Sequence, residues 1–586
     1  MLLSIRKDSN FSSKSKVMVH YEFRIEHPNQ QYIQIKASFR SEEDELIVRI
    51  PSWRPGRYEL GNFAKNVKGF KVYDEKNKRL EASKINKDSW MIHTSGTDSI
   101  RVEYHYYALE LNAGSTYLSK DQLYVNPVNC CMYTDRQAED PTMLELHIPT
   151  EWKVAGSMKN ENNVLYASNF DELADSPFMC SAGIQHDQYE SNGTLFHLWF
   201  NGEVKPDWDR LKRDFQAFTD KQIEKFAEFP VKEYHFLFQI LPIKAYHGVE
   251  HCKSTVIALG PSYDIFGTLY KELLGVSSHE LYHTWNVKSI RPIEMHPYDF
   301  TKENYSRLGY ICEGITTYMG DLFLLKSGVF DLKQYLEEMN VQLQKHFDNH
   351  ARFNYSVGES SFDTWLDGYV PGAPGRKVSI YTEGCLLAFV TDIMILRATN
   401  NKYGLDEVMK RLFFDYALKQ KGVSEADYMR ELENISGLSF IEFFREFVHG
   451  TNPYEEVLTE SFEYLGLELK HSPARAYSQS RLGFKASTNG SGFNVSALYP
   501  GGPADLSGLM INDEIIAVNG MMCSGELDKW LKFYDDDPKR LTVVRAGRVM
   551  EFTLPEVNRN FYSEYSVGIL ENPNGPQKKA LEAWKN

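Results

Sequence analysis

The stretch Ser277-Ser-His-Glu-Leu-Tyr-His-Thr-Trp285 carries two histidines four positions apart, with a glutamate directly after the first. On a helix, residues i and i+4 lie on one face, so the imidazoles of His279 and His283 can converge on a single metal ion. Glu280 lies one residue round the helix, where it can reach a water at the ion without binding the ion itself. This H-E-x-x-H pattern predicts a zinc site on a helix, with Glu280 as the catalytic base.

A catalytic zinc takes three protein ligands and keeps one position open, so a third ligand must lie elsewhere in the chain. Glu313, in Tyr310-Ile-Cys-Glu-Gly-Ile-Thr-Thr-Tyr318, is the downstream candidate, because a second helix that crosses the first could present it to the same ion. We therefore predict one zinc ion per chain on His279, His283 and Glu313, in an arrangement that resembles the gluzincin peptidases. The competing interpretation is a surface helix with a polar face.

The spacing of the hydrophobic residues differs between the N-terminal part of the chain and the part around this stretch. About the first 185 residues alternate as strands do, with strands expected at 21–26, 32–39 and 45–50. A further strand is expected at 234–241. Helical spacing is found at 207–229, 266–287, 310–327, 332–347, 379–398, 405–417 and 440–449. Strands followed by a mainly helical half predict a multidomain α+β protein with an N-terminal β-rich domain, either a sandwich or a large mixed sheet.

Composition limits the classes of protein that remain. A chain of 586 residues exceeds one ordinary core and suggests two to four domains. The net charge of −15 argues against nucleic acid as a partner, because phosphate binding needs a basic surface. Seven cysteines without paired C-x-x-C spacing indicate reduced, buried thiols. No long apolar run is present, so we expect a soluble protein without a membrane span, either cytoplasmic or, if a signal peptide was removed, periplasmic or secreted.

A third unit begins near residue 462 and has the features of a PDZ domain. Its segments are Arg481-Leu-Gly-Phe484, Gly501-Gly-Pro-Ala-Asp-Leu-Ser-Gly-Leu509 and Asn512-Asp-Glu-Ile-Ile-Ala-Val-Asn-Gly520. The backbone N–H groups of Leu482, Gly483 and Phe484 would face the carboxylate of a peptide C-terminus. The alternative is a PDZ domain that packs on the rest of the chain without a ligand. The expected domains are 1–185 (β-rich), 186–460 (catalytic), 461–570 (PDZ) and a C-terminal tail at 571–586.

The segment Ala245-Tyr-His-Gly-Val-Glu-His251 resembles the G-x-M-E-N strand of gluzincin aminopeptidases. The resemblance implies that the strand backbone at Gly248 and Val249 aligns the substrate, while Glu250 takes its free α-amine. A carboxylate beside the cleft favours an ammonium group and would restrict cutting to the N-terminus. His247 and His251 depart from the pattern, and an exposed loop containing histidine is the alternative.

The tetrahedral oxyanion needs a donor besides the metal. Tyr381, in Ser379-Ile-Tyr-Thr-Glu-Gly-Cys-Leu-Leu387, begins a helix at the place where similar aminopeptidases carry a catalytic tyrosine. An ordinary core tyrosine is an equally good interpretation in a chain with 35 of them. Tyr310 and Tyr318, beside Glu313, are weaker candidates.

Taken together, the motifs resemble one family, the glycyl aminopeptidases. The matching segments are Ile50-Pro-Ser-Trp-Arg-Pro-Gly-Arg-Tyr58, His247–His251, His279–Lys288 with Arg291-Pro292, and Glu313–Thr316. The resemblance implies a β-rich N-terminal domain, a thermolysin-like, mainly helical catalytic domain and a C-terminal PDZ domain. It also implies a zinc metallopeptidase that releases N-terminal Gly, Ala or other small residues from peptides with a free N-terminus.

One position departs from thermolysin-like sites, which often carry an Asp four residues after the third ligand to orient a zinc histidine. Here that position is Thr317, so Asn286 and Asp321 are the candidates to replace it. Two other functions stay open at this point. One is another hydrolase on the same metal, such as an endopeptidase or a zinc epoxide hydrolase, and the other is a non-catalytic PDZ scaffold on a peptidase fold.

Overall fold

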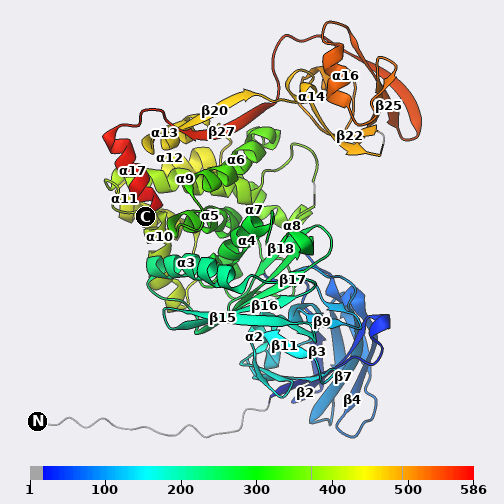
Figure 1. Cartoon of the computed structure of the whole chain (residues 1–586). Coiled ribbons are helices and arrows are strands. Elements are labelled where there is room, and N and C mark those ends of the chain that lie inside the picture. The colour runs from blue at the N-terminus through cyan, green and yellow to red at the C-terminus, as the bar shows by residue number, and fades with distance from the viewer. Residues whose placement is uncertain (1–17, 371, 491) are drawn as a thin grey trace, which may run out of the picture. The chain divides into compact units, whose positions relative to one another are not determined.

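The computed structural model describes residues 18–370, 372–490 and 492–586, which form two compact units. The first unit runs to Phe330 and adds Ser361–Val370 and Leu405–Ile435. The second unit contains Asp331–Ser360, residues 372–404, and Ser436–Asn586. Figure 1 traces the chain from the N-terminal strands, in blue, to helix α17, in red. The described residues contain no helix long and apolar enough to cross a lipid bilayer.

The N-terminal part of the first unit is built from β-strands. Its elements are β1 (Val19–Arg24), β2 (Tyr32–Arg40), β3 (Glu45–Arg49), β4 (Val67–Asp74), β5 (Ala82–Asn86), β6 (Ser89–His93), β7 (Ser99–Tyr107), β8 (Tyr117–Leu118), β9 (Gln122–Val125), α1 (Pro127–Cys130), β10 (Thr142–His147), β11 (Lys153–Gly156), β12 (Lys159–Glu161), β13 (Val164–Ala167), α2 (Phe170–Ala174) and β14 (Phe178–Ser181). A seven-stranded sheet has the order β12-β13-β10-β1-β2-β7-β4, beside sheets of four and three strands. Because β1 pairs in parallel with β10 and antiparallel with β2, the expected large mixed sheet is confirmed.

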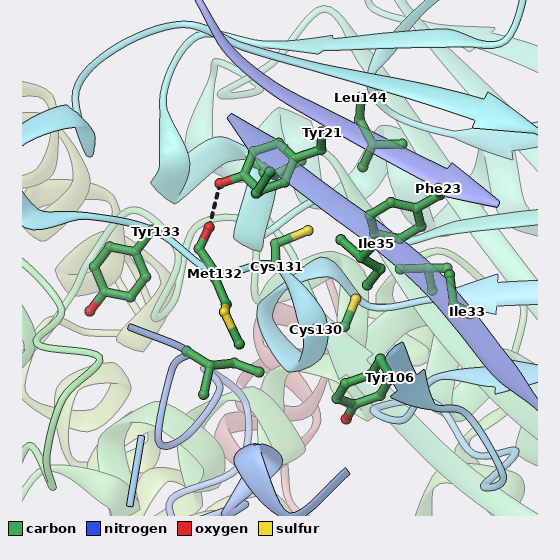
Figure 2. Close-up of a cluster of buried hydrophobic side chains, with 14 of the residues drawn as sticks. Tyr21, Phe23, Ile33, Ile35, Tyr106, Cys130, Cys131, Met132, Tyr133 and Leu144 are labelled. Carbon is green, nitrogen blue, oxygen red and sulfur yellow. Dashed lines mark hydrogen bonds between the residues drawn. The ribbon is translucent and has the colours of Figure 1, made fainter. Parts of the chain in front are cut away.

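Alternation along these strands creates the core of the β-rich part. Tyr21 and Phe23 of β1, together with Ile33 and Ile35 of β2, are almost fully buried, while the residues between them are partly exposed. Figure 2 shows these side chains facing the segment Cys130–Tyr133, where the Tyr21 hydroxyl donates to the Met132 carbonyl at 2.7 Å. All seven cysteines are free thiols and six are buried, as the sequence predicted.

A second sheet and two helices follow within the first unit. They are β15 (Gln185–Ser191), β16 (Thr194–Asn201), α3 (Trp208–Phe226), β17 (Glu233–Ile240), β18 (Ala245–Glu250), β19 (Ser254–Gly260) and α4 (Tyr270–Tyr282). The strand order is β15-β16-β17-β19-β18, with β16, β17 and β19 parallel and β18 antiparallel at the edge. The sequence predictions of α3 and β17 are confirmed within a few residues. In Figure 1, α4 lies beside β18, which brings the H-E-x-x-H helix to the edge of this sheet.

Helices complete both units. The first unit adds a π-helical turn at Tyr310–Ile315, α5 (Thr316–Lys326), α8 (Thr364–Asp367), α10 (Leu405–Asp415) and α11 (Glu425–Ser436); α7 (Val357–Phe362) spans the division between the units. The second has α6 (Leu332–Asp348), α9 (Ile380–Ala398), α12 (Ile441–Phe443) and α13 (Glu455–Tyr464). The helix expected at 266–287 is shorter than predicted: it ends at Tyr282, because the chain then turns, with Val287 at a φ of 85°.

The C-terminal part of the second unit contains the PDZ-like module. Its elements are β20 (Leu467–Pro473), α14 (Tyr477–Ser480), β21 (Phe484–Asn489), β22 (Gly492–Leu498), α15 (Pro503–Leu506), β23 (Glu514–Val518), β24 (Met521–Met522), α16 (Leu527–Phe533), β25 (Lys539–Arg545), β26 (Arg548–Leu554), β27 (Ser563–Ile569) and α17 (Gly575–Lys585). β21 to β26 form one sheet with its own apolar core, while β20 and β27 form a separate two-stranded sheet. The segment expected as a tail forms helix α17. This helix packs on the second unit, where Trp584 is buried against Tyr335 at a ring distance of 5.2 Å.

Candidate metal centre

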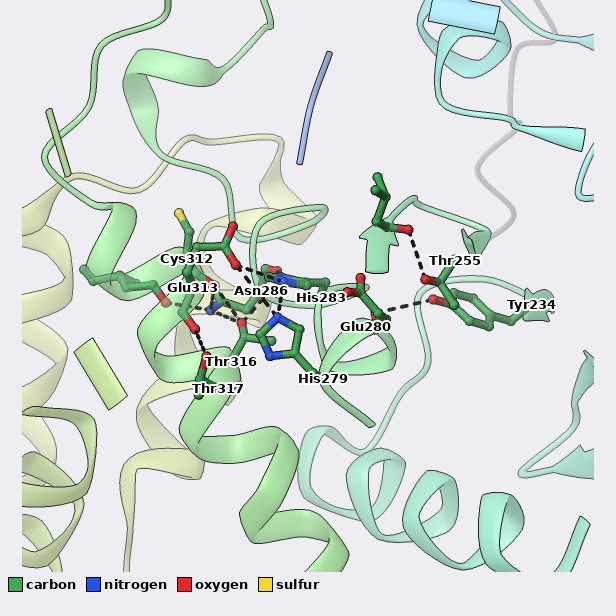
Figure 3. A network of polar contacts seen from close by, with 12 residues as sticks. Tyr234, Thr255, His279, Glu280, His283, Asn286, Cys312, Glu313, Thr316 and Thr317 are labelled. Carbon is green, nitrogen blue, oxygen red and sulfur yellow. Dashed lines mark hydrogen bonds and ion pairs between the residues drawn. The ribbon is translucent and has the colours of Figure 1, made fainter. Parts of the chain in front are cut away.

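The three predicted metal ligands lie together at the end of α4. His279 is in the last turn of the helix and His283 caps it. Their Nε2 atoms are 3.0 Å apart, and the Glu313 Oε2 atom lies 3.8 Å from the first and 3.4 Å from the second. Figure 3 shows all three side chains turned toward one point. The predicted second helix that presents Glu313 is therefore present, as the π-helical turn that leads into α5.

These separations fit a zinc ion. Zinc holds histidine nitrogen and carboxylate oxygen at about 2.0–2.2 Å, so two donors of a tetrahedral set lie about 3.3–3.5 Å apart. The observed separations of 3.0, 3.4 and 3.8 Å scatter around that value. The donor set and its spacing therefore fit a zinc ion.

The tautomer of His283 is fixed by the turn that ends α4. Its Nδ1 donates to the backbone carbonyl of Asn286 at 3.0 Å, which leaves the Nε2 lone pair free for a metal. The Asn286 amide in turn donates to the carbonyls of Ile311 and Cys312, at 2.9 and 3.2 Å. Val287, which follows, has a positive φ that a β-branched residue rarely adopts. Through this strained turn, hydrogen bonds connect His283 to the helical turn that carries Glu313.

The Thr317 hydroxyl does not replace the missing Asp. It donates to the Glu313 carbonyl of its own helix at 2.8 Å. Asn286, one of the two candidates for that role, contacts His283 through its backbone, and its amide donates to the Thr316 hydroxyl at 3.0 Å. The orienting group on His283 is thus a main-chain carbonyl, a kind of partner that the side-chain pattern of the sequence does not reveal.

A glycine allows the two ligand-bearing helices to approach. A Cβ at Gly320 of α5 would lie 2.9 Å from the Cα of His279, so only glycine permits this crossing without a shift. The Ser278 hydroxyl donates to the Gly320 carbonyl at 2.6 Å across the same contact. From the other side, Gln222 of α3 donates to the Ser278 carbonyl at 3.0 Å. The H-E-x-x-H helix is therefore held by α3 and α5 together.

Buried charge dominates the electrostatics of the centre. Burial, with the neighbouring His283 ring, holds the pKa of His279 well below its usual value. Burial alone would also lower the pKa of His283, but Glu313, Glu250 and Glu280 outweigh it and raise that pKa to about 10. Burial raises the pKa of Glu280, and the nearby carboxylates of Glu250 and Glu313 add to the effect. A divalent cation relieves this crowding of carboxylates, which again fits a metal.

Strand β18 places Glu250 beside the predicted base. Glu250 is 4% exposed, and one of its oxygens lies within 4.8 Å of both an oxygen of Glu280 and a nitrogen of His283. Among the described residues no hydrogen-bond donor pairs with Glu250 Oε1. A Cβ at Gly248 would overlap Glu280 Oε1, so the strand backbone runs directly against the predicted base. The adjacent His251 does not share this position, since its Nδ1 pairs with Asp175 at 3.1 Å.

Gly248→Ala is expected to lower kcat/KM by roughly 10²-fold while the zinc content stays near that of the wild type. The added methyl group displaces the Glu280 carboxylate but no predicted ligand, and misplacing a catalytic group by about 1 Å costs that much. Steady-state kinetics and metal analysis of the purified variant measure both quantities. Gly568→Ala is the matched control, because a Cβ there meets nothing within 4 Å. Unchanged kinetics in Gly248→Ala would contradict the assigned position of Glu280.

The site also contains residues that the sequence did not single out as functional. They come from the turn after β3. A Cβ at Gly56, with φ +78°, would lie 2.5 Å from Glu250 Oε2. Tyr58 is 4% exposed, its hydroxyl has no partner among the described residues, and the charges of Glu313 and Glu250 add to burial in raising its pKa. The signal in the sequence was the segment Ile50–Tyr58, whose resemblance to the family gave these residues no role in the site.

The remaining predicted site residues lie elsewhere. Tyr381 lies in the first turn of α9 in the second unit, and its role stays a prediction. Tyr310 donates to Glu425 at 3.0 Å, so its hydroxyl is engaged away from the ligands. Tyr318 is buried in α5. The PDZ loop at 482–484 precedes and begins β21, with Gly483 at a positive φ.

Comparisons with known proteins agree with this architecture. Three family models match: the peptidase M61 N-terminal domain at 20–182, the M61 glycyl aminopeptidase at 272–387 and the PDZ domain at 472–525. A solved aminopeptidase N family protein from Idiomarina loihiensis shares 24% identity with a TM-score of 0.88, covering 97% of this chain and 100% of that one. An M1 zinc metallopeptidase from Deinococcus radiodurans shares 11% identity with a TM-score of 0.46, covering 74% and 94%. No curated protein matches the chain.

The β-rich domain, the helical region around H-E-x-x-H and the His-His-Glu cluster define a metallopeptidase, a hydrolase of peptide bonds. The chain belongs to the M61 glycyl aminopeptidase family and carries a C-terminal PDZ domain.

Proposed function

We propose that the protein is a zinc aminopeptidase that releases N-terminal Gly, Ala or other small residues from peptides with a free N-terminus. One zinc ion is bound by His279, His283 and Glu313. The observation that carries the proposal is the buried carboxylate of Glu250, which lies within 4.8 Å of the predicted base Glu280 and whose Oε1 has no hydrogen-bond partner among the described residues. A buried carboxylate oxygen without a hydrogen-bond donor is costly, and a substrate ammonium group supplies that donor.

The edge strand β18 aligns the peptide. No other strand of the described residues pairs with its outer edge, so the backbone at Gly248 and Val249 is available to an extended substrate. A zinc ion held by these residues would lower the pKa of a bound water and polarise the scissile carbonyl. Glu280 takes the proton from the attacking water and passes it to the leaving amine. Glu250 holds the α-amine, which sets the cut after the first residue.

The preference for a small first residue has two supports. One is membership of the M61 glycyl aminopeptidase family. The other is the close approach of Gly56 to Glu250, which leaves little room beside the proposed amine site. Crowding by backbone at that place disfavours large side chains.

Glu250→Gln is expected to lower kcat/KM for alanine p-nitroanilide by roughly 10²- to 10³-fold. The amide keeps the shape but loses the charge that holds the ammonium in a water-poor site. A panel of aminoacyl p-nitroanilides, free and N-acetylated, assayed with and without a chelator, measures this. The N-acetylated substrates should not be cut, and Glu45→Gln, an exposed strand residue, serves as the control. Equal cutting of blocked and free substrates would favour the endopeptidase alternative, whereas chelator-sensitive epoxide opening without peptide cleavage would favour the epoxide hydrolase.

We also propose Tyr381 as the donor that stabilises the oxyanion together with zinc, with Tyr58 as its rival in the first unit. Tyr381→Phe is expected to lower kcat by about 10²- to 10³-fold with KM little changed, since the hydroxyl acts on charge that develops in the transition state. Tyr58→Phe, measured in parallel, is expected to retain most of kcat. The reverse pattern would transfer the role to Tyr58, whose hydroxyl lacks a partner among the described residues.

The PDZ domain has a proposed ligand of its own, a peptide C-terminus at the loop Leu482–Phe484. The backbone carbonyl of Gly483 accepts from the Tyr499 N–H at 2.7 Å and that of Leu482 from the Ala504 N–H at 3.1 Å. These bonds hold the loop through the carbonyls of Leu482 and Gly483, which supports a carboxylate site at its N–H groups.

A further inference from the structure

Arg54, in the turn after β3, is a buried cation that forms no ion pair with a carboxylate of the described residues. It is 5% exposed. Its side chain forms one hydrogen bond among the described residues, from Nη1 to the Pro55 carbonyl at 3.2 Å. A guanidinium carries five N–H donors, and burying its charge without a paired anion is strongly unfavourable. Glu250 offsets part of its charge from a distance, but Arg54 keeps unused donors, which an anionic ligand would satisfy.

The guanidinium lines a polar cavity of about 330 Å³ in the first unit. A Cβ at Gly114 would overlap the guanidinium, so a glycine is needed where the cavity wall meets Arg54. Arg57 and Asn129 line the same cavity, and Asn129 Oδ1 is buried without a partner among the described residues. Arg57 already pairs with Glu59, so Arg54 is the less compensated of the two cations. Unpaired polar groups around a cavity of this size indicate a bound polar molecule.

This cavity lies close to the proposed catalytic residues. Gly56, between the two arginines, touches the Glu250 carboxylate. Burial and the positive charges of Arg54 and Arg57 lower the pKa of His247, on β18, to about 3. The charge of Arg54 also acts on Glu280. Because Gly56 lies against Glu250, the turn that carries both arginines lies beside β18.

We propose that Arg54, assisted by Arg57, binds the C-terminal carboxylate of a short peptide whose amino end lies on Glu250. This inference rests on the proposed aminopeptidase function and deepens it, because it sets the length of the substrate. Glu250 and His247 are three residues apart on one strand, a span of about 10 Å. An extended peptide of two or three residues has the same reach. The preferred substrates are thus di- and tripeptides with a free carboxylate.

The test compares peptides that differ only in that carboxylate. For Ala-Ala and Ala-Ala-Ala, the free acid should have a kcat/KM about 10- to 100-fold above that of the C-terminal amide, mainly through KM, as expected for one charge-assisted pair. Arg54→Gln and Arg57→Gln should each reduce this acid-to-amide ratio, Arg54→Gln toward one. The same ratio is measured as binding by calorimetry, with Glu280→Gln protein that does not turn the peptides over.

Arg101→Gln is a closely matched control for Arg57→Gln. Both side chains are about one-third exposed, 33% and 34%, and each pairs with a glutamate two residues later. Arg101→Gln should keep the wild-type ratio. Zinc content and thermal unfolding of each variant show whether it is folded, and Arg57→Gln, at the less buried position, keeps the test valid if Arg54→Gln does not fold.

The outcomes separate this inference from the function beneath it. Acid and amide cut equally well by the wild type would overturn the carboxylate site and leave the aminopeptidase standing. Cleavage of neither, together with inactivity on alanine p-nitroanilide, would remove the aminopeptidase function itself. A preference that survives in both arginine variants would also overturn the assignment of these residues.

Discussion

Glu280→Gln should reduce kcat by roughly 10³- to 10⁴-fold while zinc remains bound at close to one equivalent. The side chain is 5% exposed, its Oε2 has no partner among the described residues, and the backbone at Gly248 holds it in place. Glutamine fits the same space but cannot take a proton from water, so the loss falls on proton transfer and not on binding. Kinetics with alanine p-nitroanilide and metal analysis of the same preparation measure the two expectations.

Glu272→Gln is the control for that substitution because it also replaces a carboxylate with an amide on α4, but in the first turn of the helix. Its activity should stay within about twofold of the wild type. If Glu280→Gln kept more than a tenth of the wild-type kcat with zinc in place, Glu280 would not be the base. A fall in kcat together with loss of zinc would instead mean that the residue supports the metal centre.

Much of the fold was predictable because its signals are local. The apolar spacing of 207–229 predicted α3, and the run at 234–241 predicted β17. The i, i+4 spacing of His279 and His283 likewise fixes their convergence through helix geometry alone. Such patterns need no knowledge of distant residues, so one sequence is enough to find them.

The helix end that was predicted wrongly and the site residues that were missed both depend on contacts between parts of the chain that lie apart in sequence. The end of α4 was placed too late because the chain leaves the helix to bring the Asn286 carbonyl to His283, and main-chain partners leave no mark in a side-chain pattern. Arg54, Gly56 and Tyr58 were not assigned to the site because about 200 residues separate them from Glu250. A turn rich in Pro and Gly has the same composition whether or not it closes a cleft. Only the folded chain reveals that this turn reaches the catalytic strand.

The glutamate ligand is the most distant of the three in sequence, and its removal tests whether the cluster is a metal centre at all. Glu313→Gln is expected to weaken zinc binding by at least about 100-fold and to abolish measurable peptidase activity at ordinary zinc concentrations. Glu313 is 2% exposed, and its Oε2 lies 3.4 Å from His283 Nε2. A neutral amide is a poor zinc ligand, and the loss should exceed the 10- to 100-fold typical of residues that only support a ligand.

Thermal unfolding gives a readout of Glu313→Gln that does not depend on activity. A ligand at about 1,000 times its Kd stabilises the folded state by about 4 kcal/mol, so a chelator should lower the unfolding temperature of the wild type by several degrees. The same chelator should hardly change that of Glu313→Gln, since the variant holds little zinc. Glu224→Gln, an exposed position on α3, should behave as the wild type does. A variant that still bound zinc with wild-type affinity, or a wild type insensitive to chelation, would mean that the buried histidines and carboxylates around Glu313 are not a zinc site.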